Sequence, residues 1–179
     1  MAHPRPLAFL AAALLLVTPL VGGCSREHER GDGYRMCVRV VDGDTIFLDA
    51  PSLRGGGEKI RLIGVDAPEL HRPRTPVQYF ARESKAYLQT LVENKRVRVT
   101  YDFPHYDRWH RTLAYVYLED GTFVNLEMVR RGYAAALTQF PFRFLNKFRD
   151  AAHSAREGSA GLWAHTDSVG VPVANQRSN

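Results

Sequence analysis

The sequence predicts an α+β fold, in which a small closed barrel of five strands carries three helices. Three observations support this prediction: short β-rich runs bounded by turn residues, amphipathic helical segments between those runs, and 179 residues of which 45% are hydrophobic. A chain of this size and composition can build one ordinary domain with its own core. Five short strands with interspersed helices are typical of small closed barrels.

The expected strands are rich in β-branched and aromatic residues and end at turn signals. The first two flank Asp42-Gly43-Asp44, which is typical of a hairpin turn. The third run follows a glycine-rich loop. The fourth alternates apolar and polar residues, so one of its faces is expected to be solvated, whereas the fifth is apolar on both faces and is expected to be central. These strands are residues 36–41, 45–48, 59–65, 96–103 and 112–118.

Three segments carry apolar residues at helical spacing. In the first, Phe80, Leu88 and Val92 fall on one face. The second ends before Gly132, a typical position for a residue with positive φ. The third combines an apolar face with several exposed basic residues. The predicted helices are residues 77–92, 124–131 and 142–157.

An apolar segment precedes the domain. Residues 1–23 contain one charged side chain, Arg5, and an apolar run at 7–17. This pattern is typical of a secretory signal peptide, and the run is too short to span a bilayer comfortably. The sequence Val21-Gly22-Gly23-Cys24 resembles a bacterial lipobox, which predicts cleavage before Cys24 and lipidation of that cysteine. A plain signal peptide with a coincidental cysteine is the alternative.

The rest of the chain divides by composition. Residues 24–33 are polar and contain glycine, so we expect a flexible tether. The domain is expected at 34–164, and the aperiodic residues 165–179 are expected to form a disordered tail. Acyl chains on Cys24 would anchor the protein stably at a membrane. We therefore expect an exported lipoprotein of the cell envelope, on its periplasmic or cell-surface side, or otherwise a secreted protein.

Charge and cysteine content add weaker constraints. The formal charge is +5, or +4 once Arg5 is removed with the signal peptide. A mildly basic surface favours anionic partners such as nucleic acid or acidic lipid. If Cys24 is lipidated, Cys37 has no partner for an intrachain disulfide, and we interpret it as a small buried hydrophobe.

Three polar clusters combine carboxylates with arginines. Carboxylates suit a hard cation such as Ca²⁺, and arginines suit a phosphate, which they hold through two parallel hydrogen bonds. Hydrolysis of a phosphodiester would need a site with both. The clusters are Asp42-Gly43-Asp44-Thr45, Arg61 with Asp66-Ala67-Pro68-Glu69, and Asp107-Arg108-Trp109-His110-Arg111.

Each cluster taken alone also has a structural interpretation. The first could build a tight turn, the second could be a loop entry with an acidic cap, and Asp107 with Arg111 could be an exposed ion pair. His105 and His110 invite a zinc site, since imidazole suits zinc, but no further cysteine or histidine pair completes a tetrahedral set.

Taken together and in this order, the clusters resemble the staphylococcal nuclease (thermonuclease) family. The resemblance runs from Met36 to Trp163 and includes Leu113-Ala114-Tyr115-Val116-Tyr117, Val124-Asn125, Arg131-Gly132 and Gly161-Leu162-Trp163. It implies an OB-fold, that is, a five-stranded β-barrel with three helices. It also implies roles for single residues. The calcium ligands would be Asp44, Asp66 and the backbone carbonyl of Ala67. The catalytic residues would be Arg61 and Arg111, which grip the phosphate, and Glu69, the general base.

The third cluster departs from the family pattern, which commonly has tyrosine and then glycine before the second arginine. Trp109 has no hydroxyl for a terminal phosphate, and His110 adds bulk that could alter the loop. The base-stacking tyrosines of the founding member fall near Thr138 and Phe140, so stacking is expected to be arranged differently. The remaining expected substrate contacts are His71, Arg72, Arg74, Arg108 and Trp109.

These features predict a monomeric, calcium-dependent nuclease with little sequence preference that cleaves DNA and/or RNA to 3′-phosphate products, as the resemblance implies. One alternative is a non-catalytic OB-fold lipoprotein that binds nucleic acid, and another is a structural envelope lipoprotein. Glu69 and the two arginines favour the enzyme, because binding alone does not require a general base.

Overall fold

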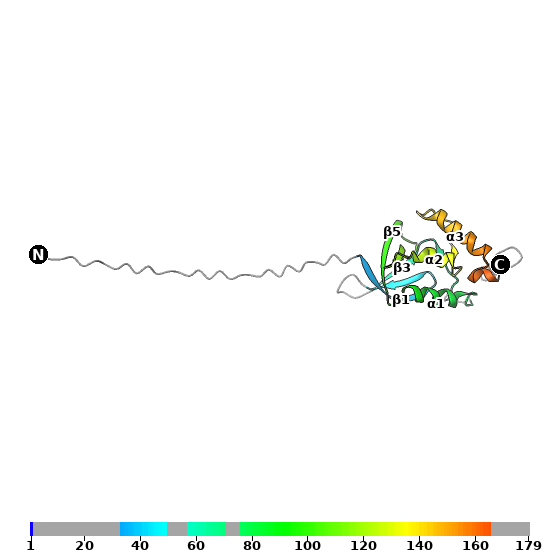
Figure 1. Ribbon diagram of the computed structural model, residues 1–179, viewed down its shortest axis with the longest axis horizontal. Helices are drawn as coiled ribbons and strands as arrows, with labels where there is room; N and C mark the ends of the chain where they lie inside the picture. Colours follow the sequence, from blue (N-terminus) through cyan, green and yellow to red (C-terminus); the bar gives the residue numbers. More distant parts are fainter. Residues whose placement is uncertain (2–32, 50–56, 71–75, 166–179) are drawn as a thin grey trace. The chain divides into compact units, whose positions relative to one another are not determined.

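The structure is a computed structural model that describes Met1 and residues 33–49, 57–70 and 76–165. Four strands precede the first helix, and the remaining strands are interspersed with helices (Figure 1). The strands are β1 (Tyr34–Asp42), β2 (Thr45–Leu48), β3 (Glu58–Leu62), β4 (Val65–Asp66), β5 (Arg96–Tyr106), β6 (Thr112–Leu118) and β7 (Ala135–Ala136). The helices are α1 (Ala81–Val92), α2 (Val124–Arg130), α3 (Leu145–Glu157) and a short 3-10 helix, η1 (Gly161–Ala164).

Five strands close a barrel in the order β1-β2-β3-β6-β5, with β5 pairing back onto β1. Neighbouring strands are antiparallel, except that β3 and β6 run parallel. The hairpin β1–β2 turns between Asp42 and Thr45, as the sequence predicts. Strands β4 and β7 form a separate two-stranded sheet. The predicted α+β fold, a five-stranded barrel with three α-helices, is therefore confirmed.

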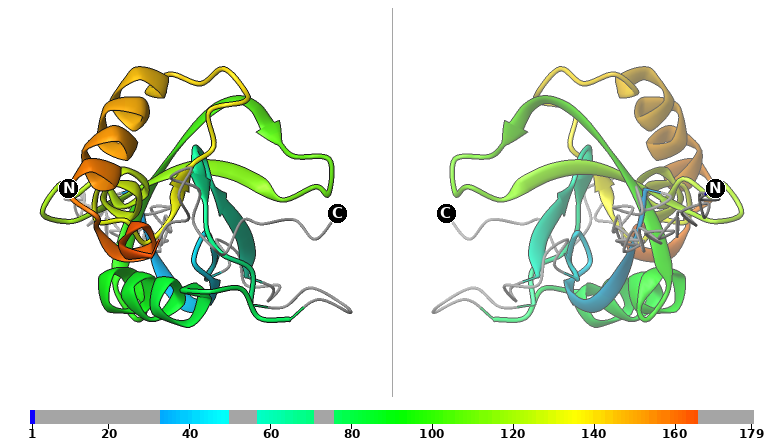
Figure 2. Two further views of the ribbon diagram at one scale, coloured as in Figure 1. Left: turned by 90° about the vertical axis from the view of Figure 1, so that its right-hand side faces the viewer. Right: turned by 90° about the vertical axis from the view of Figure 1, so that its left-hand side faces the viewer.

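The three α-helices gather on one side of the barrel (Figure 2). Helix α1 packs on β1, α2 packs on β6, and α3 packs on α2. The inward faces of the helices carry buried residues such as Leu88 of α1, Met128 of α2 and Phe148 of α3. This arrangement leaves the opposite side of the barrel, with the β5–β6 turn, uncovered by helices.

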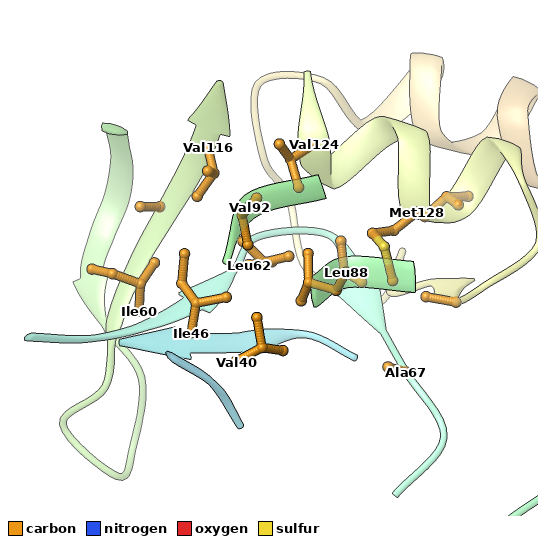
Figure 3. Close-up of a cluster of buried hydrophobic side chains, with 14 of the residues drawn as sticks. Val40, Ile46, Ile60, Leu62, Ala67, Leu88, Val92, Val116, Val124 and Met128 are labelled. Atoms are coloured by element: carbon orange, nitrogen blue, oxygen red, sulfur yellow. The ribbon is translucent and has the colours of Figure 1, made fainter. Parts of the chain in front are cut away.

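One apolar core fills the barrel and continues beneath the helices. Figure 3 shows Ile46, Ile60 and Leu62 from the strands meeting Leu88 and Met128 from the helices, and all five side chains are almost completely buried. Burial of one such side chain stabilises a fold by about 1.5–3 kcal/mol. The core therefore supplies a rigid support for the turns at the barrel edge.

Cys37 belongs to this core. Its side chain is fully buried on β1, and burial raises the pKa of its thiol to about 11. The thiol therefore stays protonated at neutral pH and acts as a small hydrophobe, in agreement with the interpretation of the sequence.

Three strands differ from the predicted bounds. Strand β1 spans Tyr34–Asp42 rather than residues 36–41. The run 59–65 is not one strand, because Gly64 adopts a φ of +76° and turns the chain between β3 and β4. The run 96–103 continues to Tyr106, and its final residues do not face the core. The alternation in this run predicts the strand correctly but not the exposure of Phe103.

Two helices begin later than predicted. Helix α1 begins at Ala81 rather than at residue 77, because Phe80 takes a left-handed conformation with a φ of +63°. Helix α3 begins at Leu145 rather than at residue 142. Phe142 and Phe144 precede it and pack against the core as partly buried residues.

Some expected features lie outside the described residues. They are almost all of the signal peptide 1–23, Cys24 with nearly all of the tether 24–33, and residues 166–179 of the predicted tail. Within the described part of the chain, no helix has the length and apolar character needed to cross a membrane.

Candidate active site

The barrel register brings the three polar clusters onto neighbouring strands. Thr45, at the start of β2, pairs with Arg61 on β3, and Arg61 pairs with Leu113 on β6. Arg111 directly precedes β6. Side chains alternate along a strand, so Arg61 lies on the face opposite the buried core residues of β3. Asp44 and Arg61, which are far apart in the sequence, therefore meet at the outer face of the barrel, and Arg111 lies two residues before the Leu113 that pairs with Arg61.

Asp44 is buried beneath the β1–β2 turn. Its carboxylate accepts hydrogen bonds from the Thr45 hydroxyl at 2.9 Å and from the Ala67 backbone N–H at 3.1 Å, and it forms an ion pair with Arg61. Burial raises the pKa of Asp44, whereas the positive charge of Arg61 opposes that shift. A carboxylate in this position is stabilised in its ionised form by a nearby cation.

Arg61 joins two of the predicted carboxylates. Its guanidinium pairs with Asp44, and its Nη2 atom lies 3.9 Å from Oδ1 of Asp66. The Asp66 side chain is half exposed, whereas those of Asp44 and Arg61 are largely covered. The cluster therefore opens toward solvent on the Asp66 side, and a phosphate or a cation would enter there.

Glu69 follows this cluster on a loop that is held by Gln78. The Glu69 backbone N–H donates to the Gln78 side-chain carbonyl at 2.7 Å, and the Gln78 N–H donates to the Glu69 backbone carbonyl at 3.1 Å. These two hydrogen bonds fix the backbone of Glu69 three residues after Asp66. The Glu69 side chain is half-buried.

Arg111 is oriented by Asp107. The Asp107 carboxylate accepts hydrogen bonds from Nε of Arg111 at 2.6 Å and from the Arg111 backbone N–H at 2.9 Å. The same carboxylate accepts the Trp109 backbone N–H at 2.8 Å. Because Asp107 engages Nε, the terminal nitrogens of the guanidinium point away from this contact and can bind a phosphate. The ion pair of Asp107 with Arg111 that the sequence suggested is therefore present, but both side chains are largely covered rather than exposed.

Trp109 and His110 shape the turn between β5 and β6. His110 adopts a φ of +58°, a left-handed conformation that glycine would take without steric cost. His110 therefore occupies a left-handed position in the turn, directly before Arg111 and the start of β6. Trp109 is 61% exposed, and the guanidinium carbons of Arg108 and Arg111 lie 4.0 and 5.0 Å from its ring centroid.

Asn125 supports the site from below, a role that the sequence did not reveal. This fully buried residue of α2 accepts the Val116 N–H at 2.8 Å and donates from its side-chain amide to the carbonyls of Ile63 and Ala114, both at 3.0 Å. It thereby ties α2 to β6 and to the β3–β4 turn that leads to Asp66. The sequence signals available for Asn125 were its place in the Val124-Asn125 pair of the family resemblance and its position at a helix start.

Gly43 also has a positional role that its sequence context did not show. A Cβ atom at this position would lie 1.9 Å from Oγ of Ser84 and 2.6 Å from Cβ of Ala67. Only glycine allows α1, which carries Ser84, to approach the turn that holds Asp44. The hairpin signal predicted the turn, whereas the close approach of a helix required the tertiary structure.

Two of the predicted cation ligands lie on either side of Arg61. Two carboxylates, Asp44 and Asp66, converge on one positive group, and the Ala67 backbone lies against the Asp44 carboxylate. Oxygen ligands of this kind suit Ca²⁺. Among the described residues, no set of three or more His, Cys, Asp or Glu side chains is arranged around a common metal position, so a cation here would also use backbone or solvent oxygen.

The other predicted site residues are placed differently. Arg108 and Trp109 lie on the turn beside Arg111. The expected substrate contacts His71, Arg72 and Arg74, and the expected lipidation site Cys24, lie outside the described residues.

The barrel is of the OB type, and the carboxylate and arginine cluster at its edge contains the type of side chain that recognises phosphate groups. Comparison with known proteins specifies the class of protein. Residues 59–165 match the family of staphylococcal nuclease homologues. The chain is 38% identical to a thermonuclease of Staphylococcus intermedius over 142 residues. The aligned region covers 78% of this chain and 80% of that protein.

Two further relatives agree with this match. A thermonuclease of Staphylococcus hyicus is 35% identical over 144 residues, which cover 80% of this chain and 81% of that protein. A protein of Haemophilus influenzae described as an uncharacterized endonuclease is 34% identical over 162 residues, covering 89% and 80%. The chain therefore belongs to the staphylococcal nuclease family.

Proposed function

We propose that this protein is a calcium-dependent nuclease that hydrolyses phosphodiester bonds of DNA and/or RNA with little sequence preference. Its family and its thermonuclease and endonuclease relatives make it a nuclease, that is, a hydrolase acting on ester bonds. The observation that carries the calcium proposal is the position of Arg61 against both Asp44 and Asp66. A phosphate-binding group thus adjoins two cation-binding groups.

Each charged residue has a proposed role in the reaction. Arg61 and Arg111 stabilise the negative charge that grows on the phosphate oxygens in the transition state. Glu69 orients the attacking water or accepts its proton. Because the arginines act mainly in the transition state, loss of either should lower kcat more than it raises KM.

The residues that would hold Ca²⁺ are Asp44, Asp66 and the backbone carbonyl of Ala67. When bound, the cation would neutralise a phosphate oxygen and help to orient the nucleophile. The hydrogen bonds from Thr45 and Ala67, which fix both oxygens of Asp44, support this proposed role.

The proposed products follow from the family resemblance. Water attacks the phosphorus, the bond to the 5′ oxygen of the next nucleotide breaks, and a 3′-phosphate end remains. The basic residues His71, Arg72 and Arg74 would contact the phosphate backbone of the substrate.

We further propose that the protein is exported, anchored in a membrane of the cell envelope through a lipidated Cys24, and active as a monomer. Metabolic labelling with a palmitate analogue tests the anchor. Label is expected on the wild type and not on Cys24→Ser, and an unlabelled wild type would contradict the proposal.

The test of the reaction uses the purified protein and single-stranded DNA, with Ca²⁺ or with a chelator, and analyses the product ends. We expect cleavage only with Ca²⁺ and 3′-phosphate ends. Glu69→Gln should lower kcat at least about a hundredfold, while the matched control Glu83→Gln, an exposed glutamate of α1, should be fully active. Tight DNA binding by a wild type that does not cleave would instead favour the non-catalytic binding protein.

A further inference from the structure

Large aromatic side chains are exposed at the far end of the β5–β6 hairpin. Phe103 is 86% exposed, Tyr106 59% and Trp109 61%. We call these three residues the aromatic tip. Isolated exposed apolar residues are common on protein surfaces, but a local group of large aromatic rings marks a binding surface more often. None of the three rings contributes to the apolar core.

A large bulge in β5 accompanies the exposure of Phe103. Tyr101 pairs with Ala114 and Tyr106 pairs with Thr112, so the intervening residues 102–105 lie opposite Leu113 alone. Bulges of this kind redirect side chains and occur often beside functional sites. The bulge turns Phe103 away from the barrel interior that Val97 of the same strand occupies.

Asp102 holds the bulge in place. Its carboxylate accepts hydrogen bonds from the Tyr115 hydroxyl at 2.6 Å, the Arg143 N–H at 2.8 Å and the Phe103 N–H at 2.9 Å. The strand β6 and the segment before α3 therefore both fix the base of Phe103. These hydrogen bonds hold the backbone of Phe103 in place. The hairpin that carries Phe103 projects on the side away from α3 (Figure 2).

The aromatic tip is continuous with the candidate active site. Trp109 contacts the guanidinium groups of both Arg108 and Arg111. The rings of Tyr101, His105 and Tyr106 follow one another, with centroid distances of 5.5 Å and 6.5 Å. The two acidic residues in this stretch, Asp102 and Asp107, are engaged in hydrogen bonds within the hairpin. The surface thus combines aromatic rings with arginine charge.

We propose that the aromatic tip is a subsite for unpaired bases, which extends the active site along a single-stranded nucleic acid. Exposed rings stack on the faces of bases, and neighbouring arginines contact the phosphates between them. A duplex covers its base faces by pairing and stacking, so only single-stranded or frayed substrate can use these rings. This proposal rests on the proposed nuclease function, and Phe103 and Tyr106 act in it as substrate-binding residues.

The experiment compares the full-length protein with the double variant Phe103→Ala, Tyr106→Ala. For a single-stranded oligonucleotide of about twelve nucleotides we expect KM to rise about tenfold with kcat changed by less than about twofold. For a dinucleotide, which we expect to occupy Arg111 and Trp109 but not Phe103 and Tyr106, kcat/KM should not change. For the matching duplex the double variant and the wild type should have the same KM.

Two control variants exclude a general loss of structure. The conservative pair Phe103→Tyr, Tyr106→Phe keeps both rings and should restore the KM of the wild type. Val38→Ala removes an exposed apolar side chain of β1 and should have no effect. An unchanged KM for the oligonucleotide in the alanine variant, or an equal change for the dinucleotide, would overturn the proposal.

The same variants separate this surface from a membrane contact. If the alanine variant lost sedimentation with anionic phospholipid vesicles while its KM for the oligonucleotide stayed unchanged, the tip would be a membrane-binding surface instead. If the wild type cleaved no substrate, the proposed function would fail, and fluorescence anisotropy of the labelled oligonucleotide would still test the tip. Equal affinity of the wild type and the alanine variant in that assay would refute it independently.

Discussion

Asp107 shows how one residue determines the orientation of a catalytic candidate. Burial acts to raise the pKa of Asp107, but hydrogen bonds from the Arg111 backbone and guanidinium outweigh burial and hold that pKa below its usual range. The carboxylate is therefore ionised at neutral pH. It binds Nε of Arg111 at 2.6 Å, so it fixes the direction in which the guanidinium faces.

We predict that Asp107→Asn lowers kcat about tenfold and leaves KM within about twofold, because Arg111 remains present but is less well oriented. Steady-state cleavage of single-stranded DNA measures both constants. Asp120→Asn, which changes an aspartate in the turn after β6, is the matched control and should behave as the wild type. A wild-type kcat in Asp107→Asn would show that Arg111 needs no such support.

At the scale of secondary-structure elements, the approach of α1 to the β1–β2 turn positions Asp44. Gly43 lies directly against Ser84 of α1, whose hydroxyl is buried without a hydrogen-bond partner among the described residues. The same turn contacts Ala67, which donates to Asp44. A change in the spacing between helix and turn should therefore shift both proposed oxygen ligands together.

Gly43→Ala should destabilise the protein by about 2 kcal/mol, the usual cost of overpacking a closely packed position, and should weaken the activation of cleavage by Ca²⁺. Urea denaturation gives the stability, and a Ca²⁺ titration of cleavage gives the activation. Ser84→Ala alone should be close to neutral, because it removes an unpartnered hydroxyl. When Ser84→Ala is added to Gly43→Ala, it should restore part of the lost stability, because the clash with the Ser84 hydroxyl is removed. The restoration should be incomplete, because the close contact with Ala67 remains. Full stability of Gly43→Ala would show that α1 can move freely.

At the scale of the whole molecule, Asp102 links parts of the chain that are distant in sequence. It connects the bulge of β5 to Tyr115 of β6 and to Arg143 before α3. Burial acts to raise the pKa of Asp102, but the hydrogen bonds from Tyr115, Arg143 and Phe103 outweigh it, so that pKa is lowered. A lowered pKa in the folded state stabilises the fold above the unfolded value, and this contribution is lost as pH falls through the folded value.

Asp102→Asn should accordingly reduce the free energy of unfolding by about 1–2 kcal/mol at neutral pH. The difference from the wild type should shrink below about pH 4, where the carboxyl group of the unfolded wild type becomes protonated. Urea denaturation from neutral to acid pH measures this difference in the free energy of unfolding. The control is Asp150→Asn, on the exposed face of α3. A difference that does not vary with pH would mean that the charge of Asp102 contributes nothing.

The sequence predicted most of the fold, because the turn at Asp42 to Asp44 and the periodicities of the strands and helices are local properties. The sequence analysis missed the break at Gly64 and the late start of α1 at Phe80. A residue with a left-handed backbone conformation can interrupt a strand or a helix without changing the spacing of its apolar residues. The candidate site was predicted as a set of residue types, since charged groups near turns can be identified from the sequence. The supporting roles of Asn125 and Ser84 were not predicted, because these roles depend on neighbours that only the tertiary structure brings together.

The sequence by itself determined the family, the order of the barrel strands along the chain, and the charged residues available for phosphate and cation binding. These follow from local patterns and from spacing. The tertiary structure alone decided that Arg61 joins Asp44 and Asp66, that Asp107 orients Arg111, and that Phe103 is exposed in the bulge of β5. Such contacts join residues that are distant along the chain, and only strand register and packing bring them within hydrogen-bond and ion-pair range.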